Sequence, residues 1–297
     1  MAEQISGLDL WQWRSQAQQS AIAHQIPLTE IDWLLQALTD LDRLSLRLES
    51  FKSRSTIPLK IPFPDLEQLW SDRLHQRVPL QYLIGSAPWR QFILTVSPAV
   101  LIPRPETEII IDLAIAAAQH NPALGQGHWV DLGTGSGAIA IGLADALPQA
   151  QIYAVDLSEA ALAIAKKNAT DLGFAQRIQF HQGEWFTPIT FLQGQLSGLV
   201  SNPPYIPHSQ IATLQPEVTQ HEPHLALDGG ADGLDAIRQL VAIAPLYLQP
   251  GGWWAVEMMA GQGAEVQRLL EEQGEYEAIA LHPDFAGIER FAIATRR

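Results

Sequence analysis

Short apolar runs alternate with longer helical patterns from about residue 106 to the C-terminus, and this alternation constrains the fold most strongly. Runs such as HWVDLG (128–133) and QIYAVD (151–156) have the composition of buried strands, and a helical pattern follows each. Such alternation predicts βαβ units in an α/β fold, with a doubly wound, mostly parallel seven-stranded sheet. No helical pattern separates the last two strands, EAIALHP (277–283) and RFAIATR (290–296), which predicts an antiparallel final strand at one edge.

The N-terminal part of the chain has a different pattern. Residues 8–50 place apolar residues at spacings of three and four, which predicts helices, and LEQLWSDRLHQR (66–77) predicts another. Three prolines in IPLKIPFPD (57–65) are expected to break the helical run. Two short β-rich runs around Ser97-Pro98 predict a β-hairpin. We therefore expect a small all-α domain, a β-hairpin linker and an α/β domain, over residues 1–78, 79–105 and 106–297.

The composition argues against several classes of function. The chain has no cysteine, which excludes disulfides, thiolate metal sites and cysteine nucleophiles. Its formal net charge of −14 disfavours binding to a phosphate backbone, because affinity there depends on Lys and Arg. No apolar run approaches the length of a membrane span, and no secretory signal is recognisable, so we expect a cytoplasmic protein. The nine histidines show no metal-ligand spacing, and we expect no metal.

A glycine-rich segment, Asp131–Gly137 (DLGTGSG), lies between a predicted strand and a predicted helix. Its glycines allow a tight turn and a close approach of the backbone to a ligand. Asp156 ends the next strand, where a carboxylate is placed to accept hydrogen bonds from ribose hydroxyls. These features predict a cofactor that contains adenosine, but they do not distinguish NAD from S-adenosylmethionine.

The segment Asn202-Pro203-Pro204-Tyr205 follows the fourth strand pattern, at the sheet edge where ligands bind in such folds. The prolines offer carbonyl acceptors, have no N–H donor and fix their own φ. Asn202 adds a side-chain carbonyl, and Tyr205 adds a flat ring. Such a rigid, acceptor-rich pocket suits a planar NH2 group, which favours methyl transfer from S-adenosylmethionine to an amide or amine nitrogen.

These motifs together resemble the class I methyltransferases that act on exocyclic or amide nitrogens. More of the chain, from about residue 75 to the end, is similar to the peptide chain release factor glutamine methyltransferases (the PrmC/HemK family). The similar segments are RVPLQYLIG (77–85), VLIPRPETE (100–108), EWF (184–186) and FAGIERF (285–291). The resemblance implies a Rossmann-like methyltransferase domain that methylates the glutamine side-chain amide nitrogen in the Gly-Gly-Gln motif of class 1 release factors.

The resemblance also implies roles for individual residues. The methionine part of the cofactor would lie against Gly133, Thr134, Gly135, Ser136 and Gly137. Asp156 would hold the ribose, Trp185 would pack near the adenine, and Asn202 would also lie beside the cofactor. The substrate amide would be bound by Asn202, Pro203, Pro204 and Tyr205. Of these, Asn202, Pro203 and Tyr205 would be catalytic. We expect the helical domain to recognise the protein substrate, because the Pro-rich break and the hairpin separate it from the cofactor motifs.

Three alternatives stay open. A glutamine methyltransferase of a ribosomal protein would share the same motifs. An adenine-amino methyltransferase of nucleic acid would use the same loop, but it predicts a basic face or a target-recognition domain. A non-catalytic cofactor-binding protein would not need an intact Asn-Pro-Pro-Tyr loop. Glu106 and Glu108 are candidate catalytic carboxylates, although a solvated first helical turn explains them better. We expect release factors as partners, without membrane or direct nucleic-acid binding.

Overall fold

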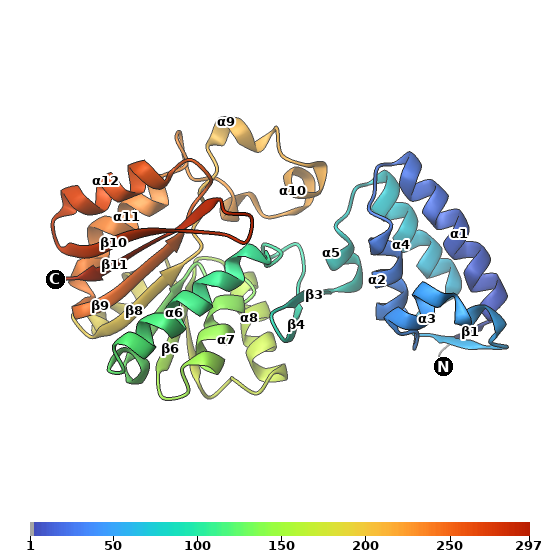
Figure 1. Ribbon diagram of the computed structural model, residues 1–297, viewed down its shortest axis with the longest axis horizontal. Helices are drawn as coiled ribbons and strands as arrows, with labels where there is room; N and C mark the ends of the chain where they lie inside the picture. The colour runs from blue at the N-terminus through green and yellow to red at the C-terminus, as the bar shows by residue number, and fades with distance from the viewer. Residues whose placement is uncertain (1–2) are drawn as a thin grey trace. The chain divides into compact units, whose positions relative to one another are not determined.

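The computed structural model describes residues 3–297, which form two compact units that divide between Gly85 and Ser86. Figure 1 shows the helical N-terminal unit and the unit that contains the large sheet. The hairpin that follows Gly85 belongs to the second unit. Among the described residues, no helix is long and apolar enough to cross a membrane.

The N-terminal unit is helical apart from one short pairing of strands. Its five helices enclose a core that includes Leu10, Ile31, Leu34 and Trp70. The strands β1 (Glu3–Ile5) and β2 (Ile57–Leu59) pair antiparallel, so the proline-rich break contains a strand that the sequence pattern did not predict. The helices are α1 (Gly7–Ala23), α2 (Thr29–Leu38), α3 (Arg43–Leu48), α4 (Phe63–His75) and α5 (Leu80–Ile84).

A seven-stranded sheet dominates the second unit, with the strand order β10-β11-β9-β8-β5-β6-β7. The five strands β5 to β9 are parallel, and β11 pairs antiparallel with both β9 and β10. This arrangement confirms the predicted fold class. The strands are β5 (His128–Leu132), β6 (Gln151–Asp156), β7 (Ile178–Gln182), β8 (Leu196–Ser201), β9 (Leu248–Glu257), β10 (Tyr276–Pro283) and β11 (Glu289–Arg296).

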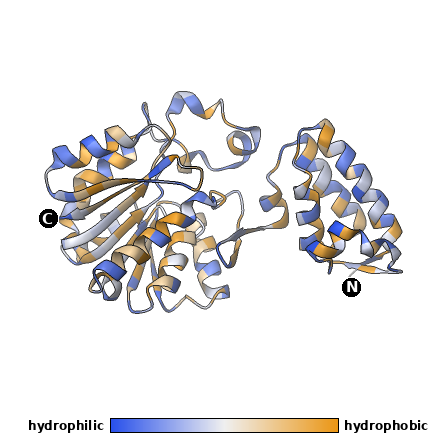
Figure 2. Cartoon of the chain, in the orientation of Figure 1, coloured by the Kyte–Doolittle hydropathy of each residue, from blue (hydrophilic) through white to orange (hydrophobic). Residues whose placement is uncertain are grey.

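Helices cover both faces of this sheet, and apolar residues concentrate in the strands and in the helix faces that pack on them (Figure 2). One face packs against α6 (Ile109–His120), α7 (Ala138–Ala146) and α8 (Glu159–Asp171), and the other against α11 (Asp235–Ile243) and α12 (Gly263–Gln273). Successive strand residues point to opposite faces, as Trp129 and Val130 do. Gly198 in β8 makes room for Trp129, because a Cβ at Gly198 would lie 2.3 Å from the indole ring.

The predicted hairpin forms, but its turn lies at a different position. Strands β3 (Ser86–Trp89) and β4 (Phe92–Thr95) pair through a two-residue turn at Arg90-Gln91, so the expected position around Ser97-Pro98 is wrong. Arg90 has a φ of +49°, and its backbone N–H donates to Glu108 Oε1 at 2.8 Å. Contacts with a distant residue therefore hold a turn that contains neither Gly nor Asn.

Candidate active site

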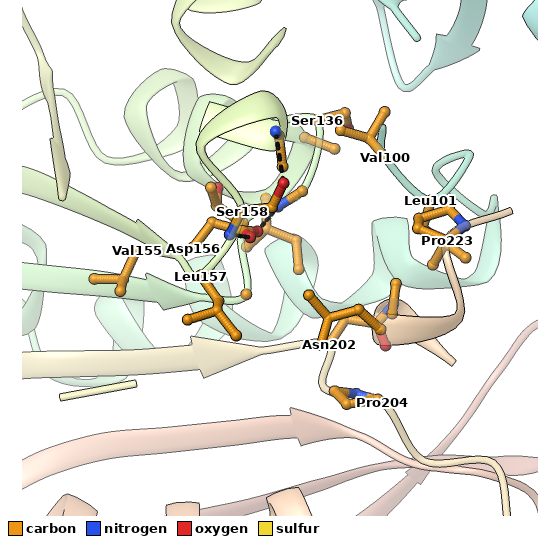
Figure 3. Close-up of a pocket in the computed structure, with 18 of the residues that line it drawn as sticks. Val100, Leu101, Ser136, Val155, Asp156, Leu157, Ser158, Asn202, Pro204 and Pro223 are labelled. Carbon is orange, nitrogen blue, oxygen red and sulfur yellow. Dashed lines mark hydrogen bonds between the residues drawn. The ribbon is translucent and has the colours of Figure 1, made fainter. Parts of the chain in front are cut away.

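A cavity of about 270 Å³ opens at the carboxyl ends of the parallel strands. It lies where the strand order reverses, because β6 and β7 extend the sheet on one side of β5 and β8 lies on the other. Ligands of open α/β sheets bind at such a point. The loops after β5, β6, β7 and β8 line the cavity, and two further walls come from residues 99–107 and 223–226. Figure 3 shows Asp156 and Ser158 on one side and Asn202 and Pro204 on another.

The glycine-rich loop after β5 is fixed by the end of β6. The backbone N–H groups of Gly133 and Thr134 donate to the Val155 carbonyl at 2.9 and 3.0 Å. Gly133 through Ser136 line the cavity. Gly137, which the family resemblance also placed beside the cofactor, is outside the lining and caps α7 with a φ of +83°. A Cβ at Gly137 would lie 3.1 Å from Ala165 Cβ, so this glycine allows close packing of α7 and α8.

Asp156 presents a carboxylate to the cavity with part of its hydrogen-bonding capacity in use. Oδ2 accepts from the Gly135 N–H and Oδ1 from the Ser158 N–H, both at 2.8 Å. Burial raises the pKa of Asp156, while these backbone hydrogen bonds favour the charged form. Because a carboxylate has about four acceptor positions, Asp156 retains positions for hydroxyl groups of a ligand.

A second carboxylate, Asp131, holds the glycine-rich loop by hydrogen bonds from its buried side. It is fully buried, and its Oδ2 accepts from Thr134 Oγ1 at 2.6 Å and from the Ala140 N–H at 3.0 Å. Its Oδ1 has no hydrogen-bond partner among the described residues. Burial, together with the nearby charge of Asp156, raises the pKa of Asp131 to about 7.

Trp185 lines the cavity from the loop after β7. It has a φ of +45°, which is uncommon for a bulky residue and indicates a backbone held by its surroundings. The ring is partly buried against the core of the sheet, and a Cβ at Gly133 would be 3.8 Å from Trp185 Cζ3. Glu184 lines the same wall. A flat apolar ring beside an acceptor carboxylate suits a heterocyclic base joined to a ribose.

The Asn-Pro-Pro-Tyr loop separates this cavity from a second one of about 240 Å³. Asn202 lines both, Pro204 lines the first and Tyr205 the second. Pro203 lines neither, and its carbonyl oxygen accepts no hydrogen bond from the residues the structure describes. Basic side chains in the second cavity come from Arg104 and Arg290. Asn202 therefore lies at the boundary between the two cavities.

Hydrogen bonds connect Asn202 with Tyr205 through two residues that the sequence had not indicated as site residues. Asn202 Nδ2 donates to Thr107 Oγ1 at 3.3 Å, and Thr107 Oγ1 donates to Glu257 Oε2 at 2.6 Å. Tyr205 donates its hydroxyl to Glu257 Oε1 at 3.0 Å. Burial raises the pKa of Glu257, and burial with the adjacent Glu257 carboxylate raises the pKa of Tyr205.

An ion pair fixes another wall that sequence reasoning did not identify. Arg104 Nη2 lies 2.8 Å from both carboxylate oxygens of the buried Glu222, and Arg104 lines both cavities. It joins the loop before α6 to the segment that contributes Pro223, Leu225 and Ala226 to the first cavity. Of the two candidate acids flanking Thr107, Glu108 is engaged by Arg90 instead of lining the cavity. Only the resemblance of residues 100–108 indicated that this loop matters.

The chain matches a family model described as a methyltransferase domain over residues 126–228. It is 52% identical to a release factor glutamine methyltransferase of Synechocystis, over 98% of this chain and 97% of the relative. It is 50% identical to a release factor glutamine methyltransferase of Thermosynechococcus vestitus, over 96% of each chain.

A solved structure is similar in fold along most of the chain. The catalytic domain of hMettl16, in complex with the MAT2A 3′UTR hairpin 6, matches with a TM-score of 0.56 and 13% identity, over 88% of each chain. At this identity the similarity concerns the fold alone.

Proposed function

The chain belongs to the family of release factor glutamine methyltransferases, and from this premise we propose its substrate, its cofactor and the residues that act in methyl transfer. Its substrate is the glutamine of the Gly-Gly-Gln motif of class 1 release factors, and the methyl group goes to the side-chain amide nitrogen. Its cofactor is S-adenosylmethionine. The observation that carries the proposal is the position of Asn202 between two cavities, one suited to each reactant.

The residues of the first cavity fit such a cofactor. Asp156 keeps acceptor positions for the ribose hydroxyls, and Trp185 offers a flat ring for the adenine. Gly133 through Ser136 line the cavity and would hold the methionine part. The chemistry that this cofactor supplies when bound is a methyl group on a positively charged sulfur.

Asn202 and Pro203 would act on the amide nitrogen. This nitrogen is a poor nucleophile because its lone pair is delocalised into the carbonyl group. Asn202 Oδ1 and the Pro203 carbonyl would accept hydrogen bonds from the two N–H groups and so aim the lone pair at the methyl carbon. These hydrogen bonds would strengthen as positive charge develops on nitrogen, which stabilises the transition state more than the ground state. The amide nitrogen would take up the methyl group that the sulfur gives up, and it would then lose one proton to solvent.

The remaining residues would place the substrate. Tyr205 and Pro204 would fix the plane of the amide from the two sides of Asn202. The N-terminal unit, which has its own core and contributes no residue to the first cavity, would bind other parts of the release factor. Because release factors act in translation, we place the protein in the cytoplasm, and we expect no direct contact with nucleic acid.

Mass spectrometry of a purified release factor, after incubation with this protein and isotopically labelled S-adenosylmethionine, tests the proposal. One labelled methyl group is expected on the glutamine of the Gly-Gly-Gln peptide, and none on a release factor in which that glutamine is replaced. Ribosomal proteins and nucleic acids with accessible adenine serve as competing substrates in parallel reactions. Label on any of these, with an unmodified release factor, contradicts the proposed substrate.

A further inference from the structure

Glu257 is a buried carboxylate at the end of β9 whose two oxygens both accept hydrogen bonds from hydroxyl groups, Oε1 from Tyr205 and Oε2 from Thr107. No Lys, Arg or His lies within ion-pair distance of it in residues 3–297. Burial of a carboxylate without a paired cation is costly, and an apolar residue would pack at the same place without that cost. Packing alone therefore does not explain an acid here.

The hydrogen bonds that Glu257 accepts determine the direction of the hydrogen bond between Thr107 and Asn202. Both oxygens of Glu257 accept from hydroxyl groups, so Thr107 gives its single hydroxyl hydrogen to Glu257 Oε2. The Thr107 oxygen then presents only lone pairs to Asn202, and the Asn202 side chain must turn its NH2 group toward Thr107. The opposite end of the carboxamide, Oδ1, consequently faces away from Thr107, and no described residue donates a hydrogen bond to it.

We propose that Glu257 and Thr107 are positioning residues that form a relay. Glu257 takes the Thr107 hydroxyl hydrogen, so the Thr107 oxygen can only accept from Asn202. Asn202 Oδ1 is thereby kept turned toward the substrate nitrogen. This inference rests on the proposed function, because it assigns to Oδ1 the hydrogen bond from the glutamine amide. The same carboxylate holds the Tyr205 hydroxyl, so one buried acid orients both polar side chains of the Asn-Pro-Pro-Tyr loop.

The relay makes a prediction that a role in packing does not make. A variant that reverses the orientation of the Asn202 carboxamide should be slower than a variant that only removes its hydrogen bond to Thr107. In Glu257→Gln, the new amide NH2 can donate to Thr107, which frees the Thr107 hydroxyl hydrogen to bind Asn202 Oδ1 and turns the carboxamide the wrong way. The remaining oxygen of the glutamine still accepts from Tyr205. In Thr107→Val, by contrast, Asn202 loses its hydrogen bond to Thr107, but no new donor favours the reversed orientation.

The test measures single-turnover methylation of a whole release factor by the full chain, at saturating S-adenosylmethionine and release factor. We expect the rate to fall about tenfold in Thr107→Val and about a hundredfold in Glu257→Gln, the scale of misplacing a catalytic group. Thr107→Ser keeps the hydroxyl and should restore a rate within about threefold of the wild type. In the double variant, Glu257→Gln should add less than about threefold to the effect of Thr107→Val, because the relay is already absent.

Two measurements separate these effects from a loss of structure. Thermal melting shows whether each variant is folded, and the dissociation constant of S-adenosylmethionine, measured by calorimetry, should stay within about twofold of the wild type. If Glu257→Gln does not fold, the comparison of Thr107→Val with Thr107→Ser is decisive by itself.

Three results would overturn the inference. Equal rates for Thr107→Val and Thr107→Ser would show that the hydroxyl does not orient Asn202. A slow Glu257→Gln beside an unaffected Thr107→Val would show that the Glu257 charge acts directly. A wild-type protein that does not methylate the release factor would refute the proposed function, and the relay with it, whereas a fully active wild type with insensitive variants refutes the relay alone.

Discussion

The phenolic hydroxyl of Tyr205, in the loop after β8, donates across 3.0 Å to Oε1 of Glu257, which ends β9 and lies 52 positions further along the chain. This hydrogen bond fixes the ring of Tyr205 at the wall of the second cavity. The raised pKa of Tyr205 keeps its hydroxyl protonated, so the residue acts as a donor to Glu257.

Removal of this hydroxyl should lower turnover more than stability. Tyr205→Phe is expected to reduce single-turnover methylation about tenfold, because the ring would no longer be held where we propose that it fixes the plane of the substrate amide. Tyr276→Phe is the matched control, since Tyr276 is buried in the same unit and donates to the Val241 carbonyl at 2.9 Å, away from both cavities. If the two variants lose the same small fraction of activity, Tyr205 has no role of its own in the reaction.

Asp156→Ala should weaken cofactor binding. The carboxylate would accept hydrogen bonds from ribose hydroxyls, and the loss of such hydrogen bonds to a charged group typically costs about 1.5–3 kcal/mol. Isothermal titration with S-adenosylmethionine measures this change. Asp156→Asn, which keeps an acceptor oxygen for the Gly135 N–H, separates ligand binding from loop structure. An unchanged affinity in the alanine variant would remove Asp156 from the cofactor site.

Asp131 should make the free energy of unfolding depend on pH. Its pKa is raised to about 7 in the folded protein from an ordinary value of 3.8, so the folded state binds more protons than the unfolded state between these values. Its contribution to stability therefore decreases as pH rises from about 4 to about 7, and changes no further above that range.

Asp131→Asn tests this pH dependence, because the amide oxygen can still accept from Thr134 and Ala140. Relative to the wild type, the variant should gain stability steadily as pH rises through this window, in chemical denaturation at several pH values. A difference between the two proteins that is independent of pH would contradict the assigned pKa.

The N-terminal unit should matter for the protein substrate and not for the cofactor. A chain that begins at Ser86 retains the described lining of both cavities, and the N-terminal unit that it lacks has its own core. If it folds, it should bind S-adenosylmethionine as the full chain does, yet methylate a whole release factor more slowly. The loss of recognition is measured by the ratio of the kcat/KM for a whole release factor to the kcat/KM for a short Gly-Gly-Gln peptide, determined for both chains. An equal ratio in both chains would exclude a recognition role.

The sheet could be predicted because its determinants are local. The apolar runs of β5 and β6, with a helical pattern after each, specify strands, and Ser158 caps α8 by accepting from the Ala161 N–H as its position suggests. The hairpin turn could not be placed, because Arg90 is held at positive φ by Glu108 and Asp112, 18 and 22 residues away.

The motifs of the site could likewise be recognised, whereas the contacts between them could not. The glycine-rich loop and Asp156 are adjacent in the fold because β5 and β6 are neighbours, which the alternation of elements predicts. Thr107 and Glu257 are separated by 150 positions and meet only in the folded protein. Glu257 ends the apolar run GGWWAVE, and this pattern indicates a buried acid without indicating its partners.

The role of Asn202 is the central claim, and Asn202→Ala tests it most directly in single-turnover methylation at saturating cofactor and release factor. The substitution removes one preorganised acceptor that acts mainly in the transition state, and such losses typically reduce turnover by about 10²–10³. Affinity for S-adenosylmethionine should change far less, because in the proposed site Asp156 and the glycine-rich loop would hold most of that ligand. A rate about a hundredfold or more below that of the wild type is expected. A rate within about threefold of the wild type would contradict the account, because the substrate amide would then be held by other residues.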